Sequence, residues 1–460
     1  GSRAGLANRH RCLRSASRLS PLKMPAFLSK VATHSLRAGV RAAPQLRCFS
    51  AAVDPVIARA REMQGIPYDS AKEGHIQAPP YDGWDKTIQE SFVKLTTGKA
   101  VNKRPFEGIC DSALDLIGFT PMVRMSRLAK FFDIECEVLA KVEFFNAGGS
   151  VKDRIGKRMI EEAEKSGRIK PGDVLIEATS GNTGIGLSLA AALKGYKMII
   201  CLPKKMSGEK VNTMKCLGAE ILRTPTEAAW DAEDSHIFLS ARLAKDLGGH
   251  VLDQYINPGN PLAHYDGTGE EIIEQTGGKL DYMIMSAGTG GTISGTAKKL
   301  KEKIPGVQIV AVDPHGSILA VPDSMNDGSA RTGQGRLTAY QVEGIGYDFI
   351  PTVLDRSVVD HWVKTDDDEA FAAMRAIVRH EGLLIGSSCG STMAGAVRFI
   401  KENKIGKDKR VAVLFADSSR NYMSKMMDDE WIKKTGFDPE TTVRAATEKG
   451  FYLEHFKVGK

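Results

Sequence analysis

The sequence has no closely spaced pair of cysteines, and this absence excludes several classes of protein. Its seven cysteines form no Cys-x-x-Cys motif and have no zinc-like spacing with histidine. Their odd number is typical of reduced thiols in a reducing compartment. No apolar run approaches the ~20 residues that a membrane-spanning helix needs. The composition therefore predicts no disulfide scaffold, no metal site and no membrane span.

Residues 1–52 contain no acidic side chain. They hold ten of the 63 Lys and Arg residues, and Asp54 is the first carboxylate of the chain. The remaining residues carry 53 basic and 56 acidic side chains, so the net charge of +7 belongs to the N-terminal segment. A nearly neutral body argues against a nucleic-acid-binding surface.

The acid-free segment is rich in Arg, Ser and Ala, which is typical of a mitochondrial or plastid transit peptide. We expect residues 1–49 to be this peptide; the alternative is a disordered basic tail on a cytoplasmic protein. Met24 is the only methionine of the segment, which leaves open whether residues 1–23 are translated. Residues 50–107 are broken by proline and glycine, and we expect an irregular extension with one short helix near residues 85–95.

From about residue 108, apolar runs of strand length alternate with helical periodicity. Predicted strands include 138–145, 173–179, 197–203 and 282–287, and predicted helices include 152–166, 183–194, 208–217 and 391–402. This alternation predicts parallel sheets that are covered on both faces. There are too many units for one sheet, so we expect residues 108–438 to form two α/β subdomains with the active site in the cleft between them. Residues 439–460 are expected to be a C-terminal tail.

Lys152 follows a glycine-rich turn at residues 146–150 and stands at the predicted start of a helix. The positive end of the helix dipole and desolvation both lower the pKa of a lysine, which makes its amine a better nucleophile. A single lysine is far more often a solvated surface residue. The interpretation therefore depends on whether other loops provide a ligand for Lys152.

Three polar loops connect a predicted strand or apolar segment to a helix, the position where parallel sheets bind ligands. Residues 180–184 (Ser-Gly-Asn-Thr-Gly) suit a carboxylate at a helix N-terminus, and residues 286–292 (Ser-Ala-Gly-Thr-Gly-Gly-Thr) suit a phosphate. Residues 386–391 present hydroxyl groups that suit a ring nitrogen. Each loop alone is equally explained as a helix N-cap.

The common nucleotide motifs do not fit the second loop. Ile293 stands where the dinucleotide fingerprint needs its third glycine, and no Lys-Ser/Thr follows Gly295 as a P-loop requires. A phosphate site, a carboxylate site, an activated lysine and a hydroxyl for a heterocycle together suit pyridoxal phosphate with an amino acid. Catalysis by Cys389 is not expected, because no Cys/His arrangement accompanies it.

Residues 108–438 resemble the cystathionine β-synthases, members of the β-family (fold type II) of pyridoxal-phosphate enzymes. The resemblance rests on long stretches at residues 141–154, 179–184, 252–255, 260–265, 343–351 and 417–422. The lysine and asparagine motifs are shared with cysteine synthases, whereas residues 144–149 and 344–349 look more like the cystathionine enzymes.

The resemblance implies a role for each matching residue. Lys152 would carry the cofactor as a Schiff base and move the substrate α-proton, and Asn182 would bind the phenolic oxygen of the cofactor. Gly288, Thr289, Gly290, Gly291 and Thr292 would hold the phosphate, and Ser388 would face the ring nitrogen. Thr179, Ser180, Gly181, Thr183 and Gln254 would bind the substrate carboxylate, and Tyr347 would lie near the second substrate.

The reaction implied is β-replacement, in which L-serine and L-homocysteine give L-cystathionine and water. The alternatives are a cysteine synthase that uses O-acetylserine and sulfide, and a cofactor-binding scaffold without catalysis. A homodimer is what the resemblance implies. Haem is not expected, because residues 50–109 hold no cysteine and a single histidine, His75. Whether a C-terminal regulatory module is missing by truncation stays open.

Overall fold

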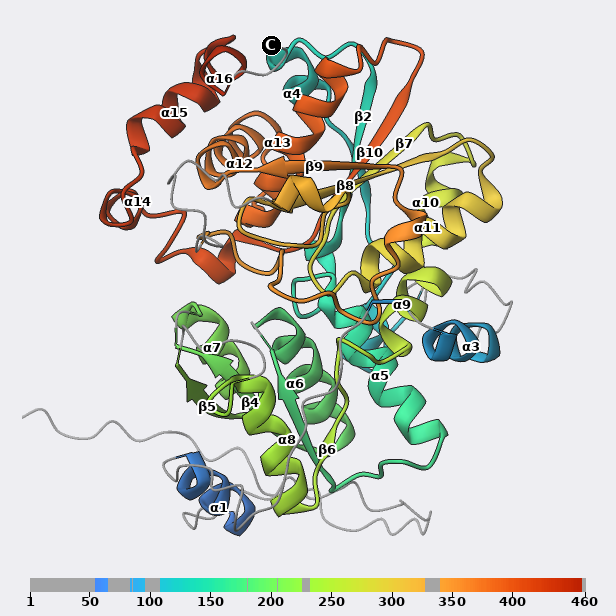
Figure 1. Cartoon of the computed structure of the whole chain (residues 1–460), viewed down its shortest axis with the longest axis vertical. Coiled ribbons are helices and arrows are strands. Elements are labelled where there is room, and N and C mark those ends of the chain that lie inside the picture. The colour runs from blue at the N-terminus through green and yellow to red at the C-terminus, as the bar shows by residue number, and fades with distance from the viewer. Residues whose placement is uncertain are drawn as a thin grey trace, which may run out of the picture. The chain divides into compact units, whose positions relative to one another are not determined.

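The structure is a computed structural model that describes residues 54–64, 83–84, 86–95, 108–179, 181–204, 206–225, 232–326 and 340–456. The described residues form two β-sheets flanked by helices (Figure 1). The proposed targeting segment and Ser180 lie outside the described residues.

The larger sheet has six strands in the order β1-β2-β10-β7-β8-β9. Their bounds are β1 Met122–Arg124, β2 Glu137–Val142, β7 Tyr282–Ser286, β8 Gln308–Pro314, β9 His361–Thr365 and β10 Arg410–Phe415. The short edge strand β1 is antiparallel to β2, and all the other neighbours are parallel. Two-sided burial of parallel strands explains their continuous apolar runs.

The larger sheet is buried on both faces because successive side chains point to opposite sides. Ile284 and Val413 pack into the core under α12 and α13, whereas Met283 and Ala412 pack into a second core under α11. The helices of this part are α4 Ser126–Phe131, α10 Gly269–Thr276, α11 Gly291–Lys303, α12 Asp367–Glu381, α13 Ser387–Glu402 and α14 Asp429–Lys434.

The smaller sheet has four parallel strands in the order β5-β4-β3-β6. Its strands are β3 Val174–Ala178, β4 Lys197–Pro203, β5 Glu220–Thr224 and β6 His250–Val251, and its helices are α5 Lys152–Lys165, α6 Asn182–Lys194, α7 Gly208–Cys216 and α8 His236–Leu247. Helices α5 and α6 pack against each other over one face, and α8 covers the other. The predicted α/β class with two parallel sheets is confirmed.

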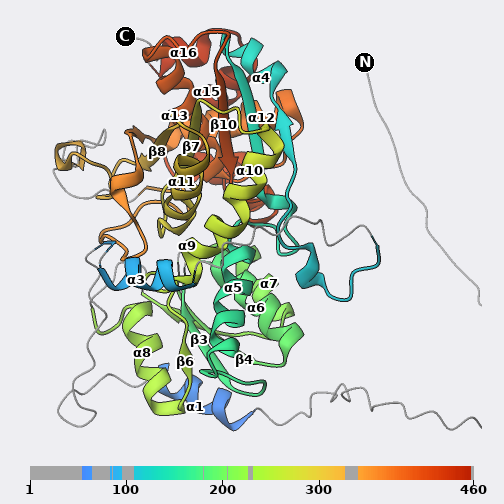
Figure 2. The same ribbon diagram turned by 90° about the vertical axis from the view of Figure 1, so that its right-hand side faces the viewer.

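Part of the N-terminal extension is helical. Helix α1 (Pro55–Gln64) packs beside α8, and Arg61 forms an ion pair with Glu220 on β5. Helix α3 (Lys86–Leu95) confirms the predicted short helix and lies alongside α9 (Gly259–Ala263), as Figure 2 shows. Among the described residues, no helix combines the length and the apolar character that crossing a membrane requires.

Two local features differ from the sequence pattern. Strand β2 ends at Val142, and residues Glu143–Phe145 form a 3₁₀ turn because the Glu143 side chain turns inward to a buried ion pair. Residues set apart as a tail form α15 (Pro439–Thr447) and α16 (Phe451–His455), and Tyr452 packs into the core beside Phe132.

Candidate functional site

The loops that follow strands β2, β3, β7 and β10 converge on one cavity. These loops leave the carboxyl ends of parallel strands, which is where open α/β sheets bind ligands. The cavity comprises about 680 Å³ of space, counting the part that opens to solvent.

Ten residues of the predicted site line this cavity. They are Lys152, Asn182, Thr183, Gln254, Gly288, Thr289, Gly290, Thr292, Tyr347 and Ser388. The structure thus brings together side chains that are separated by more than two hundred positions in the sequence.

Three other predicted residues do not line the cavity themselves, and they support the loops whose neighbouring residues do. The Thr179 hydroxyl accepts a hydrogen bond from the Gly181 amide at 3.1 Å, and Gly181 has a φ of 134° that favours glycine. Gly291 begins α11, and a Cβ there would overlap Oδ1 of Asn260. Direct contact of these residues with a ligand remains a prediction.

Lys152 is the first residue of α5, and its amide donates to Ser150 Oγ at 3.1 Å. Burial lowers the pKa of Lys152 to about 8, although the Asp417 carboxylate opposes the shift. A larger fraction of Lys152 is therefore a neutral amine near pH 7.5 than for an ordinary lysine. This is the state that attacks a carbonyl carbon.

The loop between β7 and α11 can approach an anion with its backbone at Gly288 and Gly290, which carry no Cβ atom. A Cβ on Gly288 would lie 2.5 Å from the Gly344 carbonyl oxygen, and Gly290 has a φ of +87°. The loop enters the N-terminus of α11, whose first N–H groups have no acceptor within the helix. With the hydroxyls of Thr289 and Thr292, it offers a site for a phosphate.

His264 supports this loop and was missed by the sequence reasoning. Its Nε2 lies 3.1 Å from Thr292 Oγ1, and its Nδ1 lies 2.9 Å from Thr268 Oγ1. Burial, together with repulsion from Arg154 and Lys152, holds the pKa of His264 well below its usual value. His264 is thus a neutral ring that fixes the Thr292 hydroxyl. The π-helical turn His264–Thr268 that presents it gave no signal in the sequence.

Gln254 is held at all of its polar groups. Its side-chain Oε1 accepts from Thr183 Oγ1 at 2.6 Å, and its Nε2 donates to the Ala178 carbonyl at 3.1 Å. Its amide donates to the Glu177 carboxyl at 3.0 Å, and its carbonyl accepts from Asn260 Nδ2 at 2.7 Å. Asn260 Nδ2 also lies 3.0 Å from Thr289 Oγ1, so one side chain joins the proposed carboxylate site to the phosphate loop.

The Asn182 side chain is oriented by residues beyond β10 to which the sequence analysis gave no role. Its Nδ2 donates to Asp417 Oδ2 at 2.7 Å, and its Oδ1 accepts from Asn421 Nδ2 at 3.0 Å. The Tyr422 hydroxyl also donates to Asp417 Oδ2. Burial raises the pKa of Asp417 despite the nearby Lys210 ammonium. In the sequence, only the resemblance to the cystathionine β-synthases marks the stretch 417–422.

Ser388 and Cys389 both belong to the first turn of α13, yet their environments differ. Ser388 lines the cavity, whereas Cys389 is fully buried and its Sγ lies 3.6 Å from the Asp417 carbonyl oxygen. Burial raises the pKa of Cys389 to about 12, so this thiol is not ionised near neutral pH. The geometry gives Cys389 no reactive role.

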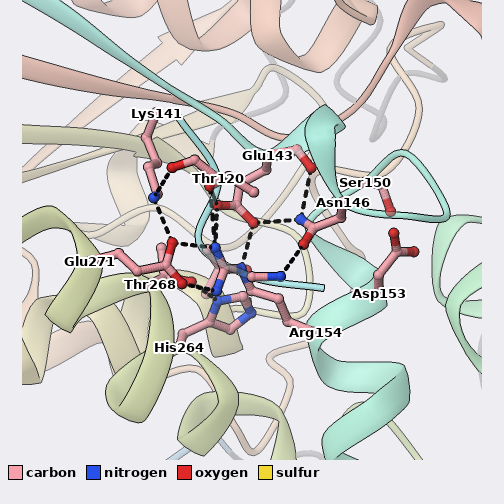
Figure 3. A network of polar contacts seen from close by, with 12 residues as sticks. Thr120, Lys141, Glu143, Asn146, Ser150, Asp153, Arg154, His264, Thr268 and Glu271 are labelled. Atoms are coloured by element: carbon pink, nitrogen blue, oxygen red, sulfur yellow. Dashed lines mark hydrogen bonds and ion pairs between the residues drawn. The ribbon is translucent and has the colours of Figure 1, made fainter. Parts of the chain in front are cut away.

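A buried network of charges fixes the N-terminal end of α5 next to Lys152 (Figure 3). Arg154 donates to Glu143 Oε2 and to Glu271 Oε1, each at 2.6 Å, and Lys141 donates to Glu271 Oε2 at 2.6 Å. Asn146 Nδ2 donates to Glu143 Oε2 at 2.9 Å, which ties the turn before Lys152 to the same carboxylate. The network joins α5, α10 and the end of β2.

Comparison with known proteins agrees with this geometry. The model of the family described as "Pyridoxal-phosphate dependent enzyme" matches residues 113–417. The chain belongs to the pyridoxal-phosphate dependent enzymes. This family assignment confirms the resemblance predicted from the sequence and the cofactor it implied.

Among curated relatives of this pyridoxal-phosphate dependent enzyme, the cystathionine beta-synthase of Dictyostelium discoideum is 57% identical over 346 residues, 75% of this chain and 67% of that protein. The cystathionine beta-synthase of Oryctolagus cuniculus is 57% identical over 330 residues, 72% of this chain and 58% of that protein. The chain thus spans about three fifths to two thirds of the length of these relatives. The solved O-acetylserine dependent cystathionine beta-synthase from Helicobacter pylori is 34% identical, with a TM-score of 0.61, and the match covers 69% of this chain and 98% of that one.

The residues present fit pyridoxal phosphate. The backbone at Gly288 and Gly290 leaves no room for a side chain, Lys152 is a desolvated amine, and Thr289 and Thr292 line the same cavity as Ser388. When bound through Lys152, this cofactor withdraws electrons from the α-carbon of an amino acid.

The lowered pKa of Lys152 predicts how the rate of cofactor capture depends on pH. In protein freed of cofactor, the rate at which Lys152 captures pyridoxal phosphate should rise with pH and level off above about 8, because the neutral amine is the nucleophile. Stopped-flow absorbance measures the rate, and N-α-acetyl-lysine under the same conditions corrects for ionisation of the cofactor. A rate that keeps rising to pH 10, as for an ordinary lysine, would contradict the assignment.

His264 should affect how tightly the cofactor is held. His264→Phe keeps a ring behind Thr292 and removes both hydrogen bonds to threonine, so we expect the dissociation constant of pyridoxal phosphate to rise about 5- to 30-fold. Absorbance titration measures the affinity, and the ³¹P chemical shift of the bound cofactor reports the phosphate environment. Thr268→Val removes the distant partner alone and should have the smaller effect. Equal effects of the two variants would argue for general disruption of the fold.

Proposed function

We propose that the protein condenses L-serine with L-homocysteine to give L-cystathionine and water. The observation that carries this proposal is the 57% identity to a cystathionine beta-synthase over 346 residues, 75% of this chain. The cavity supplies each group that the reaction needs from the protein. These groups are a desolvated amine, a carboxylate site beside Gln254 and a phosphate loop.

Each residue then has a task that follows from its position. Thr183 and Gln254, with the loop 179–181, orient the serine carboxylate so that the α-proton faces Nζ of Lys152, which removes it as a general base. The neutral Ser388 hydroxyl at the start of α13 leaves the cofactor ring nitrogen without a proton, which favours loss of the serine hydroxyl over transamination. Thiolate addition at the β-carbon completes the exchange.

Two hydrogen bonds join the two sheet-bearing parts, and closer approach of these parts would keep water away from the reacting carbon. Asn182 on α6 is bonded to Asp417 after β10, and Glu209 Oε1 on α7 accepts from the Ser424 amide at 2.7 Å. Exclusion of water matters here because water competes with the thiol for the same β-carbon.

The experiment is a substrate-pair assay. Purified protein with pyridoxal phosphate is given serine or O-acetylserine with homocysteine or sulfide, and the products are quantified by mass spectrometry. We expect cystathionine from serine and homocysteine as the fastest pair. Rapid cysteine formation from O-acetylserine and sulfide, without cystathionine from serine, would instead identify a cysteine synthase.

We also propose that residues 1–49 direct the protein to mitochondria or plastids, with cytoplasmic location as the alternative. The absence of acidic side chains before Asp54 supports this proposal. Fusion of residues 1–53 to a fluorescent protein tests it, and a variant with Arg37, Arg41 and Arg47 changed to Gln should lose import.

A homodimer is proposed for the assembly. The resemblance to the cystathionine β-synthases supports the proposal, and Phe145, which is 57% accessible on the turn before Lys152, offers an exposed position at which to test it. Sedimentation velocity measures the assembly, and Phe145→Glu should weaken it. A wild-type protein that sediments as a 49.9-kDa monomer at micromolar concentration would refute the proposal.

A further inference from the structure

A buried ion pair without a role in the scheme above lines the same cavity. Lys210 on α7 and Glu343, in the segment after residue 340, are joined by a 2.6 Å contact between Nζ and Oε2. Their side chains are 1% and 7% exposed. Of the described residues that line the cavity, these two and Lys152 are the charged ones.

Lys210 is built into the cavity wall. A Cβ on Gly181 would lie 2.5 Å from Lys210 Cδ, so the glycine lets the lysine stem pass beneath the loop that is proposed to hold the serine carboxylate. The Lys210 ammonium lies 4.4 Å from the centre of the Tyr422 ring, which adds a cation–π contact.

Glu343 keeps its charge in this setting. Burial alone would raise the pKa of Glu343, but the ammonium groups of Lys210 and Lys425 outweigh burial and lower it. Lys425 bonds the other oxygen, Oε1, and is not among the residues that line the cavity. Glu343 therefore has one cationic partner outside the cavity wall and a second, Lys210, within it.

The second substrate of the proposed reaction is itself an amino acid. Its thiol must reach the carbon above Lys152, while its own carboxylate and ammonium groups enter a largely closed cavity. Charged groups that leave water need partners of opposite charge. The groups assigned to serine, Thr183 and Gln254, are uncharged and already engaged with each other.

We propose that Lys210 and Glu343 form the head-group site for the amino-acid thiol. The substrate carboxylate binds the Lys210 ammonium and the substrate ammonium binds the Glu343 carboxylate, so the zwitterion takes the place of the direct ion pair. Lys425 continues to hold Glu343 when Lys210 turns to the substrate. Tyr347 and Ile345 line the cavity with this pair and are positioned to border the thiol chain. This inference rests on the proposed function.

A purely structural pair would behave differently. Lys210 lies in the part of the chain with the smaller sheet and Glu343 in the part with the larger one, so their contact also joins the two parts. A structural strut affects every thiol substrate alike, whereas a head-group site distinguishes thiols by their charges.

The test therefore varies the substrate and the protein together. Three thiols are compared with serine as co-substrate: homocysteine, its deaminated analogue 4-mercaptobutanoate, and its decarboxylated analogue 3-aminopropanethiol. Lys210→Gln should raise KM for the two carboxylate-bearing thiols at least about tenfold and change KM for 3-aminopropanethiol less than about threefold. Glu343→Gln should show the reverse, with the larger increases for the two ammonium-bearing thiols.

Lys425→Gln is the matched control, because it removes a cation from the same carboxylate outside the cavity wall. It should change KM for the three thiols by similar, smaller factors. Equal increases in KM for all three thiols in Lys210→Gln and Glu343→Gln would overturn the proposed site. The ion pair would then serve only to hold the two parts of the chain together. If one variant fails to fold, as circular dichroism would reveal, the other variant still shows whether KM rises selectively for the thiols that carry one kind of charge.

Failure of this inference and failure of the proposed function give separate results. The head-group site alone is refuted if the wild-type enzyme makes cystathionine and the variants change KM equally for all three thiols. A wild-type enzyme that makes cysteine from sulfide and makes no cystathionine refutes the proposed function and, with it, the ligand of this site.

Discussion

Lys152→Ala should lower the rate of cystathionine formation by on the order of 10³-fold or more while the protein stays folded. The lysine is proposed to hold the cofactor and to remove the α-proton, and general-base catalysis alone contributes about 10²- to 10⁴-fold. Its amine is desolvated in the cavity, and its pKa is lowered to about 8. Steady-state kinetics measure the loss, and the absorption spectrum should lack the band of covalently held cofactor.

A matched control separates this effect from damage to α5. Lys165→Ala changes an exposed lysine at the last residue of the same helix and should leave both rate and spectrum as in wild type. Added methylamine should partly restore turnover to Lys152→Ala, because it replaces the missing base. Substantial residual turnover in Lys152→Ala without added amine would show that another group performs the proton transfer.

The loops of the site could be predicted because their chemistry is local in the sequence. Gly288, Gly290 and the threonines stand within a few positions of one another, at the point where a predicted strand gives way to a helix. Lys152 could be predicted in the same way, since the glycine turn and the helical periodicity adjoin it. Strand–helix alternation also sufficed for the two parallel sheets, because burial on both faces requires continuous apolar strands.

The supporting residues could not be predicted, because their partners are distant in the chain. Asn182 and Asp417 are 235 positions apart, and Arg154 and Glu271 are 117 apart. In a sequence, charged residues such as Arg154 and Lys210 indicate solvent-exposed positions, since Lys, Arg and Glu are rarely buried unless paired. Only the fold reveals that each of these residues has a buried partner of opposite charge. The same limitation hid the contact of His264 with Thr292, which is 28 positions away in the chain.

Arg154→Met should destabilise the protein by about 3–5 kcal/mol at pH 7. The guanidinium is the shared partner of Glu143 and Glu271, whose side chains are 0% and 8% exposed. Removing one member of a buried ion pair leaves an uncompensated charge, which costs far more than the intact pair contributes. Urea unfolding followed by circular dichroism measures the free energy of unfolding.

Arg158→Met provides the control one turn further along α5. Arg158 also pairs with two carboxylates, those of Glu162 and Asp266, but its side chain is 17% exposed. Solvent reaches these pairs in part, so the expected loss is smaller than for Arg154→Met, about 1–2 kcal/mol. Similar losses for Arg154→Met and Arg158→Met would mean that the buried network contributes no more than this partly exposed set of pairs.

The pH dependence of the Arg154→Met effect identifies its cause. Burial raises the pKa values of Glu143 and Glu271, but the Arg154 guanidinium outweighs burial and holds both below their usual value. The stability that these carboxylates contribute is therefore present above the unfolded-state pKa near 4.5 and is lost as the pH falls through their folded-state pKa values. In Arg154→Met the two carboxyls lose this partner, so their pKa values rise and they take up protons at a higher pH than in wild type. The destabilisation should accordingly be largest near pH 7 and shrink toward pH 4. A loss of the same size at both pH values would show that the effect comes from packing of the arginine side chain. The start of α5, and with it Lys152, would then be held in place by shape and not by charge.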